Sequence, residues 1–315
     1  MIPIKIEQNK FNKIRYLYLK KINDVFVDGR IKEEGKKTIA QRKVYQDINN
    51  ELKRIGINKT LGEIIIADFK TLKGIKQKLD LFGQVYEAYD DKKNIIPKNK
   101  LVKYSQFNIL YNIFDNKLEK QWLIEELGIN VCPYCNRNFI NNLGKKTSAQ
   151  LDHFFPRSKY PIFALSICNL IPSCYSCNHI KSSNEIEVSP YDNKYNFDKS
   201  IRFSYTPKSY NYFNDYNQLD IEIISEKAIQ KNIDTMNIDE GYKIHRDYVQ
   251  EILKKAELYN NYKLKEYLNN YKNLFSSEEE ILRIVFGNYV NLELLGNRPL
   301  AKLTKDILDE LGIKI

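Results

Sequence analysis

Four cysteines in two Cys-x-x-Cys pairs mark the part of the chain whose residue types could do chemistry. They are Cys132 with Cys135, and Cys174 with Cys177. Two thiolates at this spacing can reach one metal ion from a tight turn, and two such turns supply the four-thiolate set typical of structural Zn²⁺. An ion enclosed by four thiolates keeps no open position for water, so any catalysis must come from other residues.

A second set of polar side chains lies between the two cysteine pairs. Asp152 and His153 follow segment 149–151, which we expect to form a strand, so their side chains point to opposite sides at its end. Asn169 precedes a short apolar segment that is predicted to be a second strand, and a helix is expected to open at Asn178. Strand, loop, strand and helix would bring these polar groups together at one small crevice.

These residues form a combination that is typical of one family. It consists of Asp152-His153, Asn169 and the run CNHIK from Cys177 to Lys181, preceded by the CPYC of residues 132–135. In this combination the chain resembles the HNH nucleases, whose fold is the ββα-metal finger. The resemblance covers about fifty of 315 residues. It implies an α+β chain in which an HNH finger with structural zinc is flanked by mostly helical regions.

The wording around the Asp-His pair is similar to a narrower group as well. The runs LDHFFPRSKYP and NLIPSC look like those of HNH proteins encoded beside ATPases in bacterial anti-phage systems of the Septu kind. This similarity implies a nuclease effector of phage defence that acts with an ATPase partner, which would dock on the flanking helices.

The family resemblance implies hydrolysis of phosphodiester bonds in DNA, leaving 5′-phosphate ends. Such hydrolysis needs a water made more basic and a divalent cation that stabilises the charge developing on the phosphate. His153, with an unperturbed pKa of about 6.5, is suited to accept the proton of the water. Asp152 and Asn178 would supply hard oxygen ligands, which favour Mg²⁺. Asn169 would orient His153 or brace its loop.

The second ligand of the catalytic ion has an alternative. Many members of the family have His directly after the last cysteine, where this chain has Asn178, with His179 one residue later. We favour Asn178, which makes the site richer in oxygen and better suited to Mg²⁺. If the helix register differs, His179 is the ligand, and Mn²⁺ or Ni²⁺ becomes the expected ion.

Basic residues support a polyanionic partner. Arg157, Lys159 and Lys181 are expected to hold phosphate groups. The whole chain has a net charge of +10 and a pI of about 9.1, which favours a nucleic acid. Most of the excess is Lys, and Ile, Asn and Tyr are abundant too. Because A/T-rich codons encode these residues, genome composition accounts for part of the charge.

Apolar periodicity predicts mostly helical regions on both sides of the finger. We expect a helical region at 1–127, the HNH module at 128–190, and a C-terminal region at 191–315 with a short hairpin and then helices. The expected strands outside the finger are 2–6, 201–205 and 219–224, and the expected helices are 11–26, 37–55, 61–81 with breaks near Gly74 and Gly83, 100–127, 240–274, 278–286 and 299–311. Cys168 and His245 are expected to pack without a chemical role.

The sequence favours a cytoplasmic protein without membrane contact. No apolar run approaches the roughly 18 to 20 residues that span a bilayer. The first ten residues carry charges where a signal peptide needs an unbroken apolar region. Five cysteines, four of them in regular pairs, are too few for a disulfide framework.

Two other functions fit the same residues. The same metal and base could cut tRNA or other structured RNA, because nothing in the finger reads a 2′-hydroxyl. Alternatively, the module is a non-catalytic zinc finger that binds nucleic acid or serves as a scaffold, in which Asp152 caps a turn and His153 packs.

Overall fold

The structure, a computed structural model, combines helices with small two-stranded antiparallel sheets. It describes residues 1–28, 30–31, 39–40, 46, 48–50, 52–53, 56–81, 88–89, 95–96, 120–144, 146–271 and 273–313. Within this part of the chain no helix is long and apolar enough to cross a membrane.

The described residues of the N-terminal part are mostly helical, as their periodicity predicts. Its described elements are α1 (Gln8–Asp28), β1 (Arg30–Ile31), β2 (Ile39–Ala40), α3 (Leu61–Ile65), α4 (Phe69–Leu81), β3 (Ala88–Tyr89), β4 (Ile95–Ile96) and α6 (Lys120–Leu127). The helix expected over 11–26 is confirmed by α1. The helix expected over 37–55 lies largely outside the described residues. It is wrong at 39–40, which form β2, and is confirmed at 46, 48–50 and 52–53, which are helical. The helix expected over 100–127 is described only from residue 120.

The first residues of the chain form no strand, contrary to the edge strand expected at 2–6. The amide of Ile2 donates to the carbonyl of Pro133 at 2.9 Å, and the amide of Ile4 donates to that of Pro190 at 2.8 Å. Because the two partners belong to distant segments and not to one strand, the extended segment joins no sheet. It lies against both ends of the central module instead.

The helical stretch 61–81 breaks at a different place from the one expected. Gly74 lies inside α4, and the break falls between α3 and α4. Asp68 accepts the amide of Thr71 with its Oδ1 at 2.7 Å, which satisfies one of the free N–H groups at the start of α4. The helix therefore restarts where an aspartate caps it.

The central part consists of short strands and helical turns. Its elements are β5 (Asn142–Leu143), β6 (Lys146–Thr147), β7 (Gln150–His153), the 3₁₀ turns Pro161–Phe163 and Ile167–Asn169, β8 (Leu170–Ser173) and α7 (Tyr175–Lys181). The two strands predicted around the Asp-His pair and after Asn169 are confirmed as β7 and β8, which pair antiparallel.

The C-terminal part begins with the predicted hairpin and continues as helices. Its elements are β9 (Ile201–Pro207), β10 (Leu219–Ser225), α8 (Lys227–Met236), α9 (Ile238–Tyr242), α10 (Arg246–Leu258), α11 (Asn261–Asn270), α12 (Glu278–Phe286) and α13 (Ala301–Glu310). The helical stretch expected over 240–274 is divided into α9, α10 and α11, and α8 was not predicted. α12 has its expected bounds, and Pro299 lies two residues before the start of α13.

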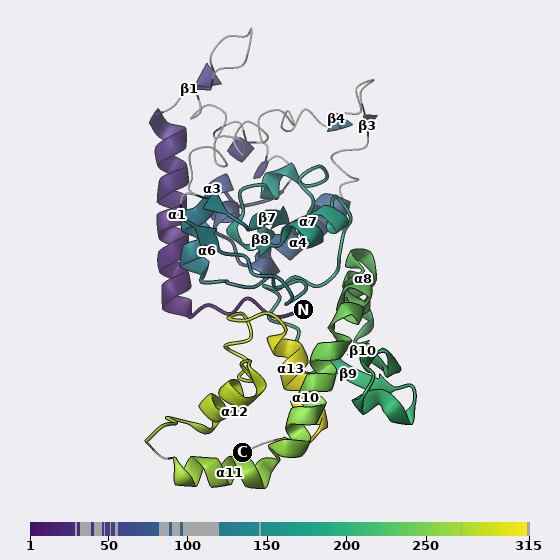
Figure 1. Ribbon diagram of the computed structural model, residues 1–315. Coiled ribbons are helices and arrows are strands. Elements are labelled where there is room, and N and C mark those ends of the chain that lie inside the picture. Colours follow the sequence, from purple (N-terminus) through teal and green to yellow (C-terminus); the bar gives the residue numbers. More distant parts are fainter. Residues whose placement is uncertain are drawn as a thin grey trace.

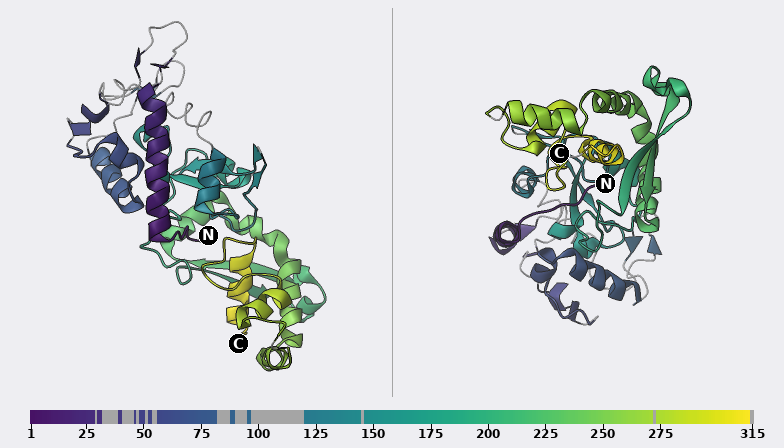
Figure 2. Two further views of the ribbon diagram at one scale, coloured as in Figure 1. Left: turned by 90° about the vertical axis from the view of Figure 1, so that its left-hand side faces the viewer. Right: turned by 90° about the horizontal axis from the view of Figure 1, so that it is seen from below.

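The elements lie in two groups along the molecule. Figure 1 shows α1, α6 and the β7–β8 hairpin in its upper half, and α10 to α13 in its lower half. α1 contacts α6, and α13 packs on β9 and α10. Figure 2 shows the same division from two further sides, with α1 in purple and α13 in yellow.

Helix α13 connects the hairpin to the first cysteine pair. Asp306 accepts the amide of Phe203, on β9, at 2.9 Å. The amide of Lys302 donates to Oδ1 of Asn136, the residue that follows Cys135, at 2.9 Å. These bonds fix the C-terminal helix against the turn that carries the cysteines.

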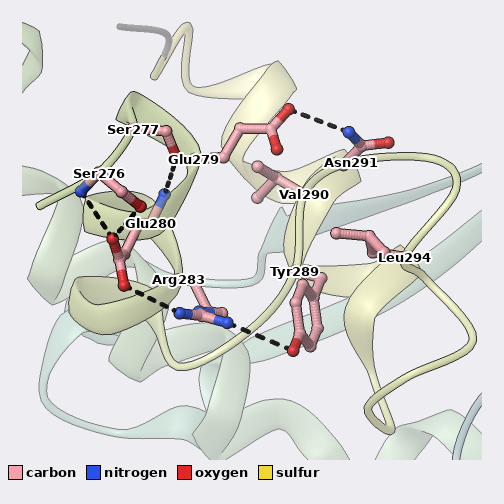
Figure 3. Close-up of a pocket in the computed structure, with 9 residues that line it drawn as sticks. All are labelled: Ser276, Ser277, Glu279, Glu280, Arg283, Tyr289, Val290, Asn291 and Leu294. Carbon is pink, nitrogen blue, oxygen red and sulfur yellow. Dashed lines mark hydrogen bonds and ion pairs between the residues drawn. The ribbon is translucent and has the colours of Figure 1, made fainter.

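A pocket of about 190 Å³ lies at the start of α12 (Figure 3). Figure 1 shows α12 away from the hairpin β7–β8. Glu280 accepts from the amide and the hydroxyl of Ser276, and Arg283 donates to Glu280 and to the hydroxyl of Tyr289. The polar groups that line this pocket thus bond to one another.

Candidate active site and metal centre

The hairpin and the helix that follows it position the residues expected to do chemistry. Strand β7 carries Asp152 and His153, which lie opposite residues 171 and 170 of β8. Helix α7 begins directly after Cys174 and contacts β7. Strand, strand and helix therefore meet at the end of β7.

The two cysteine pairs come together as the spacing predicts. Their sulfur atoms all lie within 4.8 Å of one another and are buried; the residues are Cys132, Cys135, Cys174 and Cys177. The sulfurs of Cys135 and Cys174 are 3.9 Å apart. In a tetrahedral site with Zn–S bonds of about 2.3 Å the sulfurs are about 3.8 Å apart, so the cluster fits zinc.

Neighbouring N–H groups point at the sulfurs, as a thiolate requires. The amide of Arg137 donates to Sγ of Cys135 at 3.4 Å, and Nδ2 of Asn138 donates to Sγ of Cys174 at 3.3 Å. These donors stabilise negative charge on sulfur. The fifth cysteine, Cys168, is buried outside the cluster, as expected.

The ring of His153 is held by the loop between the strands. Its Nε2 lies 3.0 Å from the carbonyl oxygen of Ala164. A carbonyl only accepts, so Nε2 carries the proton and Nδ1 is the nitrogen with the basic lone pair. Burial lowers the pKa of His153 to about 3, and the bond to Ala164 opposes that shift. The ring is therefore neutral at neutral pH, the state that a general base needs.

The carboxylate of Asp152 is bound from two sides. Its Oδ2 accepts the hydroxyl of Tyr134 at 2.6 Å, and its Oδ1 accepts from Nζ of Lys181 at 3.1 Å. The same Nζ donates to the carbonyl of His153 at 2.8 Å. Burial raises the pKa of Asp152, and the ammonium of Lys181 opposes that shift.

Asn169 is fully buried and makes the contacts of a brace. Its Oδ1 accepts the amide of Phe155 at 2.7 Å, and its Nδ2 donates to the carbonyls of Phe155 and Phe163 at 3.2 and 3.0 Å. The expectation was that Asn169 orients His153 or braces its loop. Its hydrogen bonds go to the loop, and Ala164, which holds the ring of His153, is the next residue after Phe163.

The two candidate ligands on α7 lie in different surroundings. Asn178 is half-buried. His179 is exposed, and its ring stacks on that of Tyr175 with centroids 5.5 Å apart and an angle of 8° between the planes. Residues three apart on a helix share a face, so Asn178 lies on the face of Lys181, which reaches Asp152. His179 instead lies on the exposed side of the helix with Tyr175.

The three basic residues expected at phosphates differ in exposure. Arg157 is half-buried on the loop after β7. Lys159 has a half-exposed side chain that pairs with Glu185 at 2.8 Å. Lys181 has no exposed surface, since its ammonium lies between Asp152 and the carbonyl of His153. In this arrangement a phosphate cannot reach Lys181, because the turn of α7 directs it into the protein.

Two contacts of the site were not predicted. Tyr134 carries no signal in the sequence beyond its place between Cys132 and Cys135, and its bond to Asp152 depends on how the cysteine turn packs on β7. The carbonyl of Ala164 is a backbone group, so its residue type could not indicate its role. Only the fold reveals both.

The comparisons with known proteins agree with the geometry of this region. Residues 132–184 match the family model of the HNH endonucleases. No curated protein and no solved structure gives a significant match to the chain. The matched range contains both cysteine pairs, the Asp-His pair and Asn169. The chain therefore carries an HNH endonuclease domain at residues 132–184, with a cluster of four cysteines arranged as a metal site.

Proposed function

We propose that the chain is a metal-dependent HNH endonuclease that hydrolyses phosphodiester bonds in DNA, with a structural zinc at its four cysteines. The observation that carries the proposal is the neutral ring of His153. It is held by the carbonyl of Ala164 and stands next to Asp152 at the end of β7. A polar pair fixed in this way in a matched HNH domain is suited to activate water.

The residues of the crevice divide the reaction between them. Nδ1 of His153 accepts the proton of the attacking water. Asp152 and Asn178 would hold a divalent cation, with His179 as the alternative to Asn178, and Mg²⁺ fits these oxygen donors best. When bound, this ion supplies positive charge to the phosphate and the leaving oxygen. Arg157 and Lys159 contact the phosphate backbone on either side.

The setting proposed for this activity follows from the sequence resemblance alone. We place the protein in the cytoplasm, as the nuclease effector of a bacterial anti-phage system. An ATPase partner would dock on the helices that flank residues 128–190. Its binding would restrain or release the nuclease.

The test is to incubate the purified protein with plasmid DNA and, separately, with total tRNA, in Mg²⁺ or in EDTA. We expect nicked or linear DNA with 5′-phosphate ends in Mg²⁺ and intact DNA in EDTA. If tRNA is cleaved and the DNA stays intact, the substrate is RNA instead of DNA, and the proposed hydrolysis still holds. Binding without cleavage in Mg²⁺, Mn²⁺ and Ni²⁺ would identify a non-catalytic binding protein and overturn the proposal.

A further inference from the structure

A buried ion pair lies inside the HNH domain. The side chain of Asp152 is 4% exposed and that of Lys181 is 0% exposed. Moving two charges out of water is costly unless each finds a partner, and removing one partner leaves the other charge uncompensated. The ammonium of Lys181 is therefore what permits an ionised carboxylate at this depth.

The carboxylate is also fixed in direction. Tyr134 donates to Oδ2 at 2.6 Å, and Nζ of Lys181 lies 3.1 Å from both Oδ1 and Oδ2, so rotation about the last bond of Asp152 would break the bond to Tyr134 and move one oxygen away from the ammonium. A carboxylate has about four acceptor sites, so lone pairs remain for a cation. Two donors thus leave the group oriented and still able to act as a ligand.

Both donors are attached to the cysteine cluster. Tyr134 lies between Cys132 and Cys135, and Lys181 is on α7 four residues after Cys177. The turn and the helix that bring the four sulfurs together therefore also place the two donors around Asp152. The position of the Asp152 carboxylate therefore depends on the same two segments that carry the four cysteines.

Lys181 fixes the neighbouring residue too. Its third contact is the carbonyl of His153, whose ring is held at the other end by Ala164. The ammonium of Lys181 therefore holds the backbone of β7 at His153 and balances the negative charge of the neighbouring Asp152. This role uses all the contacts seen at Nζ and needs no phosphate.

We propose that Tyr134 and Lys181 are positioning residues, which hold the carboxylate of Asp152 in one direction for a divalent cation while Lys181 balances its charge until that cation binds. The inference rests on the proposed function. Because the ammonium repels a second cation, the free protein binds the divalent ion weakly. Tight binding requires the phosphate of the substrate as an additional ligand.

The first test is a double-mutant cycle on stability. Urea unfolding of zinc-loaded Lys181→Met, Asp152→Asn and the double variant is compared without and with added Mg²⁺, in the absence of chelator. Without added Mg²⁺ we expect Lys181→Met to have the lowest urea midpoint and the double variant to regain part of the loss. Added Mg²⁺ should raise the midpoint of Lys181→Met but not that of the double variant. Lys159→Met, which breaks the exposed pair with Glu185, is the matched control, and its urea midpoint should differ little from that of the wild type.

These unfolding measurements decide the charge-balancing role without any nuclease assay. An unfolded Lys181→Met beside a folded double variant supports it more strongly still. Equal destabilisation of both variants, or equal stabilisation of both by Mg²⁺, would overturn it.

The second test compares Tyr134→Phe with Tyr160→Phe. Both lose a hydroxyl that bonds an aspartate, but the hydroxyl of Tyr160 bonds Asp80, outside the crevice, at 2.8 Å. We expect Tyr134→Phe to keep one zinc per chain, to bind Mn²⁺ about 10-fold more weakly and to lose about 10-fold in kcat with KM unchanged, as for a bond to a charged group. Tyr160→Phe should leave all of these as in the wild type.

The outcomes separate this inference from the proposed function. If the wild type cuts no nucleic acid, the proposed function fails, and Mn²⁺ binding still decides the role of Tyr134. If Tyr134→Phe loses zinc, or keeps its Mn²⁺ affinity and kcat, Tyr134 is a structural residue only.

Discussion

The tautomer of one histidine determines what the crevice can do. The carbonyl of Ala164 requires a proton on Nε2 of His153, and the low pKa keeps Nδ1 unprotonated at neutral pH. A backbone acceptor does not titrate or rotate away, so it fixes this state more firmly than a side chain would. His153 is thus held neutral, with Nδ1 as its unprotonated nitrogen.

We expect His153→Ala to abolish cleavage and to retain fold and zinc, because the ring packs beside the hairpin but binds no sulfur. The control is His245→Ala, which removes a half-buried histidine that contacts the ring of Tyr242 in the C-terminal part. Cleavage rates, circular dichroism and zinc content are measured for both. Full activity of His153→Ala would rule out its role as the base.

Asn169→Ala should destabilise the protein markedly. It leaves the amide of Phe155 and two carbonyls of a buried loop without partners, which we expect to lower the free energy of unfolding by about 3 kcal/mol. Asn214→Ala, which removes one exposed bond to Asn211, is the control. Urea unfolding measures both, and equal midpoints would contradict the bracing role.

The residues of the site were predictable where their spacing follows from covalent geometry. Two cysteines at x2 spacing converge in any tight turn, so the metal cluster was predictable. The burial of Lys181 was not, because sequence places it at the end of a helix but does not say which face of that helix meets Asp152. From the sequence alone, a lysine in a basic chain is expected to bind phosphate. Its burial against Asp152 becomes visible only in the packed structure.

At the scale of elements, caps and periodicity predicted the hairpin β9–β10 and the bounds of α12. The edge strand at 2–6 was wrong because alternating apolar residues also suit an extended segment held by two loops. The break between α3 and α4 was misplaced because a single glycine is tolerated inside a helix, as Gly74 is in α4, whereas Asp68 caps the start of α4. The division of 240–274 into three helices depends on packing that local patterns do not encode.

The start of α12 allows a direct test of a predicted cap. Ser277 accepts the amide of Glu280 with its hydroxyl at 3.2 Å. We expect Ser277→Ala to lower the free energy of unfolding by about 1 kcal/mol, because this N–H loses its partner. Ser277→Thr keeps the hydroxyl and should recover most of that loss. Thermal unfolding of the two variants, if identical, would show that the cap contributes nothing.

At the scale of the molecule, the four-cysteine cluster brings together segments that lie far apart in the chain. The cluster connects the turn before β5 to the start of α7, and residues between them form the crevice. We expect Cys132→Ser to lose zinc, to unfold at lower temperature and to lose cleavage that added Mg²⁺ does not restore. Cys168→Ser, at a buried cysteine outside the cluster, should keep one zinc per chain. Equal zinc content in both variants would contradict the assignment of the cluster.

Hydrogen bonds connect the C-terminal part to the turn that carries Cys132 and Cys135, and through that turn to Asp152. The amides of Leu300 and Lys302 bond the carbonyl and side chain of Asn136, and the hydroxyl of Tyr242 bonds the carbonyl of Cys135. Asn136 is two residues from Tyr134, which touches the carboxylate of Asp152. Helix α13 is therefore linked to the carboxylate of Asp152 through one short turn, with hydrogen bonds at both ends and two residues of backbone between them.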